Sequence, residues 1–259
     1  MFEVKLQRDI VFDPRYPNEC LLDIATPIVD QPSPLFVFFH GGGLSGGEHT
    51  LGPELVALSA QYGIAVVSAG YRLLPNAVFP DFIEDAAKAL GYVYHDMQAK
   101  DSFSSVFVGG SSAGGYLSMM LDFAPSFLAA QSLSPDMIDG WFFDAGQPTT
   151  HYALLQSQSV DPRCVRIDER APLYYLDESL QQKRTVPVLI IAASDDMPNR
   201  REENVVLYTA MKSLGYPEDR LRMIVMDGYT HTGYVGARRG EDQYVYADLI
   251  GEFIHANAK

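Results

Sequence analysis

Short runs of apolar residues alternate along this chain with longer stretches in which apolar residues recur at helical spacing. Six of these runs predict strands, at residues 35–39, 64–68, 105–108, 140–143, 186–192 and 221–226. Most of them are continuously apolar, as expected for a parallel sheet that is covered on both faces. The stretches 3–12 and 19–25 alternate between apolar and polar residues instead, which predicts antiparallel edge strands.

Helical patterns separate or follow these runs. The first covers residues 81–97 and opens with Asp81 and Glu84, which resemble a capping box. Two more cover residues 202–214 and 242–256. Strands that alternate with helices in this way predict an α/β fold: a mostly parallel, doubly wound sheet with helices on both faces.

One connection is much longer than the others. Residues 146–184 show no regular pattern but carry several aromatic and leucine side chains. Long connections in compact domains are usually functional, so we expect a small lid or substrate-pocket insertion over the carboxyl-terminal edge of the sheet. An ordinary surface loop packed by its own aromatic residues is the alternative. No repeat or linker divides the chain, and residues 1–259 are expected to form one domain.

The most informative motif is G-S-S-A-G-G at residues 110–115, which follows the predicted strand 105–108. A strand that turns sharply into a helix through small residues is the form of a nucleophile elbow, G-x-S-x-G, with Ser112 as the nucleophile. Glycine supplies the backbone freedom that such a strained turn needs. So short a motif also occurs by chance, and its meaning depends on its surroundings.

A glycine run, His40-Gly41-Gly42-Gly43, follows the strand 35–39 directly. Acyl transfer generates an oxyanion, which needs backbone N–H donors that point at one spot, and H-G-G-G after a strand is the lipase and esterase form of that device. A flexible turn is the plainer interpretation. A phosphate-binding loop is disfavoured because neither a Walker lysine nor a G-x-G-x-x-G helix start is present.

A nucleophilic serine needs a base that takes its proton. In hydrolases built on this elbow, the acid and then the base follow the serine along the chain. His231 comes after the predicted strand 221–226 and is the expected base. His151, inside the segment 146–184, is its one serious rival.

The acid that orients the base is expected after the strand 186–192, where Asp195 and Asp196 are adjacent. We favour Asp196, the last residue before the turn that follows, while Asp195 stays open. Asp168 and Asp177 are more distant alternatives.

These motifs resemble those of the hormone-sensitive lipase-like branch of the α/β-hydrolases, which includes small carboxylesterases. The stretch Tyr71-Arg72-Leu73-Leu74-Pro75, followed by Phe79-Pro80 and Asp85, is similar to the pattern Y-R-L-x-P…F-P…D of that family. The resemblance covers roughly residues 35–235.

The resemblance implies roles for individual residues. The implied catalytic residues are Ser112, Asp196 and His231. The implied oxyanion hole consists of the N–H groups of Gly41, Gly42 and Ala113. Arg72 and Asp85 are expected to form a structural ion pair.

The chain departs from the family pattern in three places. Ser111 stands where relatives usually carry an acidic residue, and the acid loop reads D-M-P rather than D-P-L. An N-terminal helical cap is not expected. In that respect the chain looks more like the compact feruloyl-esterase, acetylxylan-esterase and arylformamidase relatives.

The expected function is therefore that of a serine carboxylesterase that cleaves small to medium acyl esters through an acyl-enzyme on Ser112. An amidase of the arylformamidase type with the same triad is one alternative. A non-catalytic ligand-binding protein on a hydrolase fold is another. The expected partner is a small-molecule ester, and no metal or cofactor is expected.

Charge and composition disfavour several other classes of protein. The net charge of −14 disfavours binding to nucleic acid and to anionic membranes. No apolar run approaches the length of a membrane span, and no signal peptide is visible, which predicts a cytoplasmic protein. Cys20 and Cys164 suggest neither a metal site nor a disulfide framework. The oligomeric state stays open.

Overall fold

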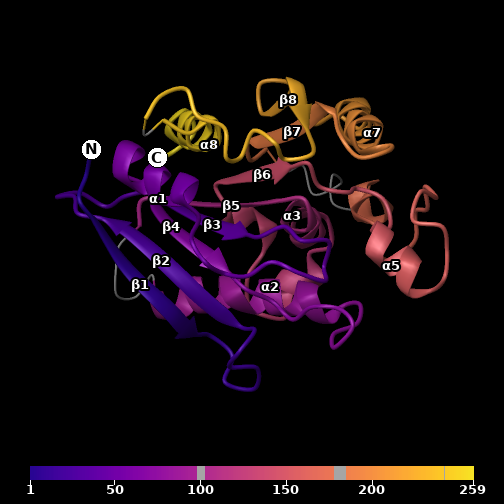
Figure 1. The fold of residues 1–259 in the computed structure, drawn as a ribbon, viewed down its shortest axis with the longest axis horizontal. Helices are drawn as coiled ribbons and strands as arrows, with labels where there is room; N and C mark the ends of the chain where they lie inside the picture. The colour runs from indigo at the N-terminus through magenta and orange to yellow at the C-terminus, as the bar shows by residue number, and fades with distance from the viewer. Residues whose placement is uncertain (98–102, 178–184, 242) are drawn as a thin grey trace.

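The computed structural model describes residues 1–97, 103–177, 185–241 and 243–259. Within these residues, one eight-stranded sheet with the order β1-β2-β4-β3-β5-β6-β7-β8 runs through the molecule (Figure 1). The strands are β1 (Val4–Val11), β2 (Leu21–Pro27), β3 (Leu35–Phe39), β4 (Ala65–Ala69), β5 (Val106–Ser111), β6 (Gly140–Asp144), β7 (Val188–Asp195) and β8 (Leu221–Thr230).

The pairing of the strands confirms the predicted mostly parallel sheet. Strands β3 to β8 run parallel to one another, whereas β2 is antiparallel to β4 and β1 is antiparallel to β2. The antiparallel N-terminal strands are thus confirmed, but only β1 lies at the edge. The prediction was wrong for β2, because β1 covers its outer side and most residues of β2 are buried.

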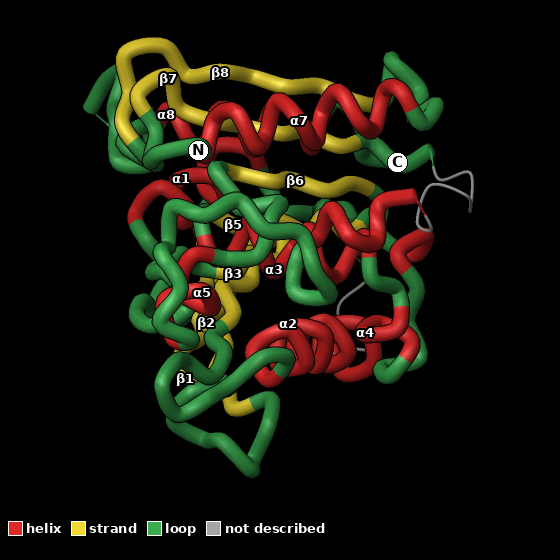
Figure 2. Tube along the Cα trace, turned by 90° about the vertical axis from the view of Figure 1, so that its right-hand side faces the viewer, coloured by secondary structure: helices red, strands yellow, loops and turns green. Residues whose placement is uncertain are grey.

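Helices cover both faces of the sheet. In the described part of the chain, the helices of eight residues or more are α1 (Pro53–Tyr62), α2 (Asp81–Tyr92), α3 (Ala113–Phe123), α7 (Arg200–Ser213) and α8 (Val245–His255). Shorter ones are α4 (Ser126–Ala129) and α5 (Tyr152–Ser157). Figure 2 shows α2 and α4 packed side by side.

Two apolar clusters form the core, one on each face of the sheet. In β3, Leu35, Val37 and Phe39 pack into the cluster that includes α2, α3 and α7. Phe36 and Phe38 face the opposite way, into the cluster that includes α1 and α8. Successive side chains of a strand point to opposite faces, so a continuously apolar run is what such a doubly covered sheet requires.

Helix ends differ in detail from the sequence prediction. The capping box at Asp81 does not form: Pro80 is the N-cap residue, and the Asp81 carboxylate accepts from the Val78 N–H instead (2.9 Å). A π-helical turn, Val93–Met97, extends α2 to the predicted end. Helix α1 was not predicted; it begins with Pro53, a residue that suits the first helical turn.

The predicted insertion 146–184 is described as far as residue 177, and its last residues lie outside the described part of the chain. Residues 146–151 are all buried. Helix α5 follows, and a 3₁₀ turn covers Pro172–Tyr175. Residues 161–167 between them are exposed.

Candidate active site

The elbow lies where β5 ends at Ser111 and α3 begins at Ala113. Between them, Ser112 has φ 55° and ψ −111°, a conformation that is strained for any residue with a side chain. The turn packs α3 tightly against the sheet. A Cβ at Gly114 would lie 1.8 Å from the carbonyl oxygen of Phe39, so only glycine fits there.

His231 directly follows β8 and reaches the serine. Its Nε2 lies 2.8 Å from Ser112 Oγ, and its Nδ1 lies 2.5 Å from Asp196 Oδ1. The carboxylate is a pure acceptor when ionised, so Nδ1 carries the ring proton and Nε2 is left to accept from the serine hydroxyl. The structure thus joins Ser112, His231 and Asp196 in one chain of hydrogen bonds.

The Asp196 side chain is 1% exposed and sits in the turn after β7. Its carboxylate also accepts from the N–H groups of Met197 (2.7 Å) and Ala193 (3.2 Å). Burial opposes its ionisation, but the interaction with His231 and these N–H groups outweigh burial and lower the pKa of Asp196. The side chain is therefore held as a carboxylate next to His231.

The alternative acids lie elsewhere. Asp195 is exposed and is the last residue of β7. Asp168 pairs with Arg170 (2.6 Å) and accepts from the Thr150 hydroxyl (2.9 Å). Asp177 is exposed at the end of a described segment. The structure brings Asp196 to His231, and it brings none of these three there.

His151, the rival base, is fully buried at the start of α5. Its Nδ1 accepts from the Ala153 N–H (3.2 Å), and its ring stacks on Tyr152. Burial lowers the pKa of His151 well below the usual value, so the ring is neutral. Its hydrogen bond serves as a helix cap.

The glycine run lies against the elbow. A Cβ at Gly41 would lie 3.1 Å from the Ser111 carbonyl oxygen and 3.3 Å from Ser112 Cβ, so the backbone at Gly41 approaches the serine closely. Gly42 has φ 117°, which only glycine adopts readily. Among the described residues, no turn or loop hydrogen bond uses the N–H of Gly41, Gly42 or Ala113.

His40 braces this loop. Its ring stacks on Tyr71 with ring centroids 4.3 Å apart, and its Nδ1 bonds the Gly41 carbonyl (2.7 Å). The Tyr71 hydroxyl in turn donates to the His40 carbonyl (2.8 Å). Burial lowers the pKa of His40 to about 4, so the ring is neutral near pH 7.

The expected ion pair between Arg72 and Asp85 is confirmed. The guanidinium donates to both carboxylate oxygens, at 2.7 and 2.8 Å, and lies 4.1 Å from the ring centroid of Tyr16. The Asp85 side chain is 2% exposed. The pair fixes the start of the segment 72–80 on α2.

Asp144 and Tyr234 lie near the site and were not singled out in the sequence analysis. Asp144, the last residue of β6, is 0% exposed, and its Oδ1 accepts from the Tyr234 hydroxyl. Burial raises the pKa of Asp144 to about 6, against the effect of the hydroxyls of Tyr234, Ser111 and Tyr246. Asp144 follows an apolar run just as Asp195 and Asp196 do, and that position was the signal that could have found it.

A cavity of about 270 Å³ lies beside the acid loop. Its lining residues are Gln147, Tyr152, Gln156, Pro162, Arg163, Met197, Pro198 and Arg200. Tyr152 also reaches the glycine run, since a Cβ at Gly43 would lie 2.1 Å from the Tyr152 hydroxyl. The cavity is thus bounded on one side by the acid loop and on the other by a residue that contacts the glycine loop.

A buried polar network supports the wall of this cavity. Arg200, 3% exposed, donates to the Ala145 carbonyl (2.6 Å) and to Gln147 Oε1 (3.0 Å). Glu203 accepts from the Thr149 hydroxyl (2.9 Å). Helix α7 therefore fixes the first residues of the predicted insertion.

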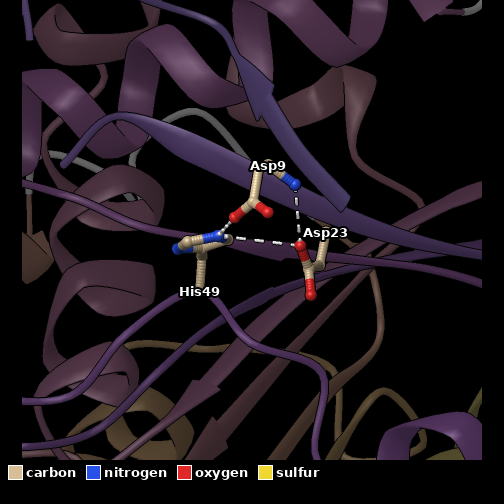
Figure 3. Close-up of side chains that lie close together, drawn as sticks. All are labelled: Asp9, Asp23 and His49. Atoms are coloured by element: carbon tan, nitrogen blue, oxygen red, sulfur yellow. Dashed lines mark hydrogen bonds and ion pairs between the residues drawn. The ribbon is translucent and has the colours of Figure 1, made fainter. Parts of the chain in front are cut away.

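Within the described ranges, one group of potential metal ligands lies together, at Asp9, Asp23 and His49. Figure 3 shows the His49 ring facing both carboxylates. Its Nε2 lies 2.9 Å from Asp9 Oδ1 and 3.6 Å from Asp23 Oδ1. Arg8 bonds the other oxygen of Asp23 (2.6 Å) and balances its charge. These contacts form a polar cluster that joins the loop after the glycine run to β1 and β2.

Two further sequence expectations concern the chain as a whole. Cys20 is buried and Cys164 is exposed, and both thiols are free. No helix in the described part of the chain combines the length and the apolar character needed to cross a membrane.

Comparison with known families gives one match over most of the chain. The family described as alpha/beta hydrolase fold matches residues 36–232. This range runs from the strand before the glycine run to the residue after His231, and it includes Ser112 and Asp196.

Curated relatives match over shorter segments. The carboxylic ester hydrolase LipN of Mycobacterium tuberculosis is 39% identical over 94 residues, which cover 34% of this chain and 24% of LipN. Tuliposide A-converting enzyme 2 of Tulipa gesneriana is 31% identical over 135 residues, which cover 44% of this chain and 35% of that enzyme. The matched segments thus span about a quarter to a third of these relatives.

Solved structures match over almost the whole chain. Carboxyl esterase 2 of Tuber melanosporum has a TM-score of 0.70 at 20% identity, with 99% of this chain and 87% of that chain covered. An esterase/lipase from an uncultured bacterium has a TM-score of 0.71 at 16% identity, with 98% and 85% covered. At such identities the likeness establishes the fold.

Proposed function

The chain belongs to the alpha/beta hydrolase fold family, and on that premise we propose that it is a serine carboxylesterase for small to medium acyl esters. The observation that carries the proposal is the chain of hydrogen bonds from Ser112 through His231 to Asp196. A nucleophile, a base and an orienting acid are the three roles that acyl transfer to serine needs.

In the proposed mechanism, Ser112 Oγ attacks the ester carbonyl carbon while His231 Nε2 takes the hydroxyl proton. The imidazolium then gives this proton to the leaving alcohol as the C–O bond breaks, and the acyl group stays on Ser112. Water, activated by His231 in the same way, attacks the acyl-enzyme and releases the carboxylic acid. Asp196 keeps the proton on Nδ1 and stabilises the imidazolium.

The tetrahedral intermediate carries a negative oxygen, for which we propose the N–H groups of Gly41, Gly42 and Ala113 as donors. The close approach of Gly41 to Ser112 and the position of Ala113 at the N-terminus of α3 support this assignment. Each such donor contributes about 10²–10³-fold in rate.

The segment 146–184 supplies the substrate pocket in this proposal, as an insertion in a single hydrolase domain. Five of the residues that line the cavity of about 270 Å³ belong to it: Gln147, Tyr152, Gln156, Pro162 and Arg163. A cavity of this volume is small for a ligand pocket, which favours a short or medium acyl group over a long chain.

The test is a series of p-nitrophenyl esters, from acetate to longer acyl chains, hydrolysed by the wild-type protein and by Ser112→Ala. We expect turnover of the short esters by the wild type and at least about a 10³-fold lower rate in the variant. A serine-directed phosphonate should label the wild type at Ser112.

Two outcomes would overturn the proposal. Undiminished esterase activity in Ser112→Ala would exclude Ser112 as the nucleophile. An absence of both turnover and labelling in the wild type would indicate a non-catalytic protein. An aryl formamide hydrolysed faster than matched acetyl and butyryl esters would assign the same residues to an amidase.

A further inference from the structure

A buried carboxylate connects the parts of the proposed site. Asp144 ends β6 next to the elbow, and Ser111 is its register partner in β5. The carbonyl oxygen of Asp144 accepts from the N–H of Ser112 (2.8 Å), so the strained serine is held by the backbone of this aspartate. Its side chain is fully buried and faces away from water.

That side chain holds the loop of the proposed base. Asp144 Oδ1 accepts from the hydroxyl of Tyr234, which follows His231 by three residues and is 0% exposed. Two turn hydrogen bonds, from Gly233 N–H to the Thr230 carbonyl (2.9 Å) and from Val235 N–H to the Thr232 carbonyl (3.0 Å), make the loop a compact unit. Fixing Tyr234 therefore fixes the position of His231.

Other groups around Asp144 come from β5, α8 and the loop of His231. The hydroxyls of Ser111 on β5 and Tyr246 on α8 face the carboxyl group and favour its charged form, as does the charge of His231. Among the described residues, Oδ2 has no partner of normal hydrogen-bond geometry. Burial raises the pKa of Asp144 to about 6, so most of the carboxyl group is ionised near pH 7, although no lysine or arginine of the described ranges forms an ion pair with it.

An uncompensated buried charge is costly, and a protein that needed only to fill this space would be more stable with an apolar or neutral side chain. The contacts of Asp144 suggest what the charge is for. They join the backbone of Ser112 to the loop of His231, whose ring becomes a cation during acyl transfer.

We propose that Asp144 is a positioning residue for the acyl-transfer reaction, an inference that rests on the proposed function. Its backbone carbonyl holds Ser112, and its carboxylate holds the His231 loop through Tyr234. Its negative charge adds to that of Asp196 in favouring the imidazolium. Small displacements of reacting groups are expensive, since a misplacement of about 1 Å costs on the order of 10²-fold in rate.

The test uses Tyr234→Phe, Asp144→Asn and the double variant, with Tyr229→Phe as the matched control. Tyr229 packs edge-on against Tyr234, and its hydroxyl makes no hydrogen bond with the described residues. Asparagine keeps the size of the aspartate and an acceptor for Tyr234, but it removes the charge. Folding of each variant is checked by near-ultraviolet circular dichroism.

We expect Tyr234→Phe to lower kcat for p-nitrophenyl butyrate by about 10–100-fold with KM changed less than about twofold. Tyr229→Phe should stay within about twofold of the wild type. The double variant should lose more activity than either single variant, because Tyr234→Phe removes a hydrogen bond that Asp144→Asn retains, whereas Asp144→Asn removes the charge.

The pH profile separates positioning by charge from a structural role. Without the Asp144 charge, the neutral imidazole is favoured, so the acid limb of kcat/KM in Asp144→Asn should move to lower pH. Tyr229→Phe should not move it. Folded Tyr234→Phe and Asp144→Asn variants with wild-type kcat and an unmoved acid limb would overturn the inference.

This failure is distinguishable from failure of the proposed function. If Ser112→Ala abolishes turnover while the Asp144 and Tyr234 variants keep the wild-type kcat and an unmoved acid limb, the esterase proposal stands and the inference on Asp144 is wrong. If Ser112→Ala keeps full activity, the proposed function itself falls.

Discussion

Adjacent residues in the acid loop have sharply different surroundings. The carboxylate of Asp196 bonds His231 and two backbone N–H groups, whereas Asp195 is exposed at the end of β7. The sequence places both after the same predicted strand, and its one indication for Asp196 is that this residue comes last before the turn. That choice depends on the turn 197–199, whose conformation includes Asn199 at φ 66°.

At this scale, we predict that Asp196→Asn lowers kcat by about 10⁴-fold, because an amide at this position favours the wrong tautomer of the base while leaving the geometry intact. Asp195→Asn is the matched control and should stay within about twofold of the wild type. Initial rates with p-nitrophenyl butyrate measure both. A loss in Asp195→Asn with full activity in Asp196→Asn would contradict the assignment.

The residues missed by sequence reasoning were missed for a physical reason. Asp144 follows the apolar run 140–143, a position shared with Asp195 and Asp196, but its partner Tyr234 lies ninety residues further along the chain. No sequence pattern near Tyr234 indicates that its hydroxyl contacts a residue at the end of β6. Long-range side-chain contacts of this kind follow from the strand order of the sheet and not from spacing.

At the scale of elements, the sequence predicted strands correctly where both faces of the strand are buried. A continuously apolar run such as 35–39 leaves little choice but a strand covered on both faces, and the fold class and the family resemblance are confirmed. Helix α1 was missed because its buried face is narrow, with Leu55, Leu58 and Ser59 as its buried residues. Its stop at Gly63, with φ 63°, was a usable signal.

The contact between β3 and α3 gives a prediction at this scale. Gly114→Ala places a Cβ against the Phe39 carbonyl, and the backbone has to move, which should lower the free energy of unfolding by about 3 kcal/mol or more. Gly236→Ala is the control, since a Cβ there meets nothing within 4 Å. Urea denaturation measures both, and equal stability of the two variants would contradict the packing described.

The whole molecule places its proposed chemistry along one edge of the sheet. Residues after β3, β5, β7 and β8 supply the glycine run, the serine, the acid and the base, while β6 supplies Asp144 (Figure 1). The carboxyl ends of parallel strands meet at one edge, so five separate segments converge there. The antiparallel strands β1 and β2 lie at one end of the strand order, beyond β4, and contribute none of these residues.

The stability of the whole molecule depends on pH through the buried carboxyl group of Asp144. The pKa of Asp144 is raised from the usual 3.8 to about 6, so the folded state binds a proton more tightly than the unfolded state between these values. Above about pH 6 the ionised group destabilises the folded state by about 3 kcal/mol, and this cost disappears as the pH falls towards 4.

We therefore predict that Asp144→Asn is more stable than the wild type at pH 7, by about 1–3 kcal/mol, and that the difference shrinks towards pH 4. Chemical denaturation at several pH values measures it. Asp195→Asn, which changes an exposed carboxylate, should show no such difference. A variant that is less stable than the wild type at pH 7 would show that the burial cost is offset by contacts not replaced by asparagine.

The buried network at Arg200 has a consequence for selectivity. Arg200 supports the cavity wall through Ala145 and Gln147, and Met197, the other side of that cavity, donates its N–H to Asp196. In the proposed function the acyl group occupies this cavity and contacts Met197, whose N–H bonds the acid that orients His231. On that proposal, substrates that fit the cavity differently are expected to differ in kcat as well as in KM.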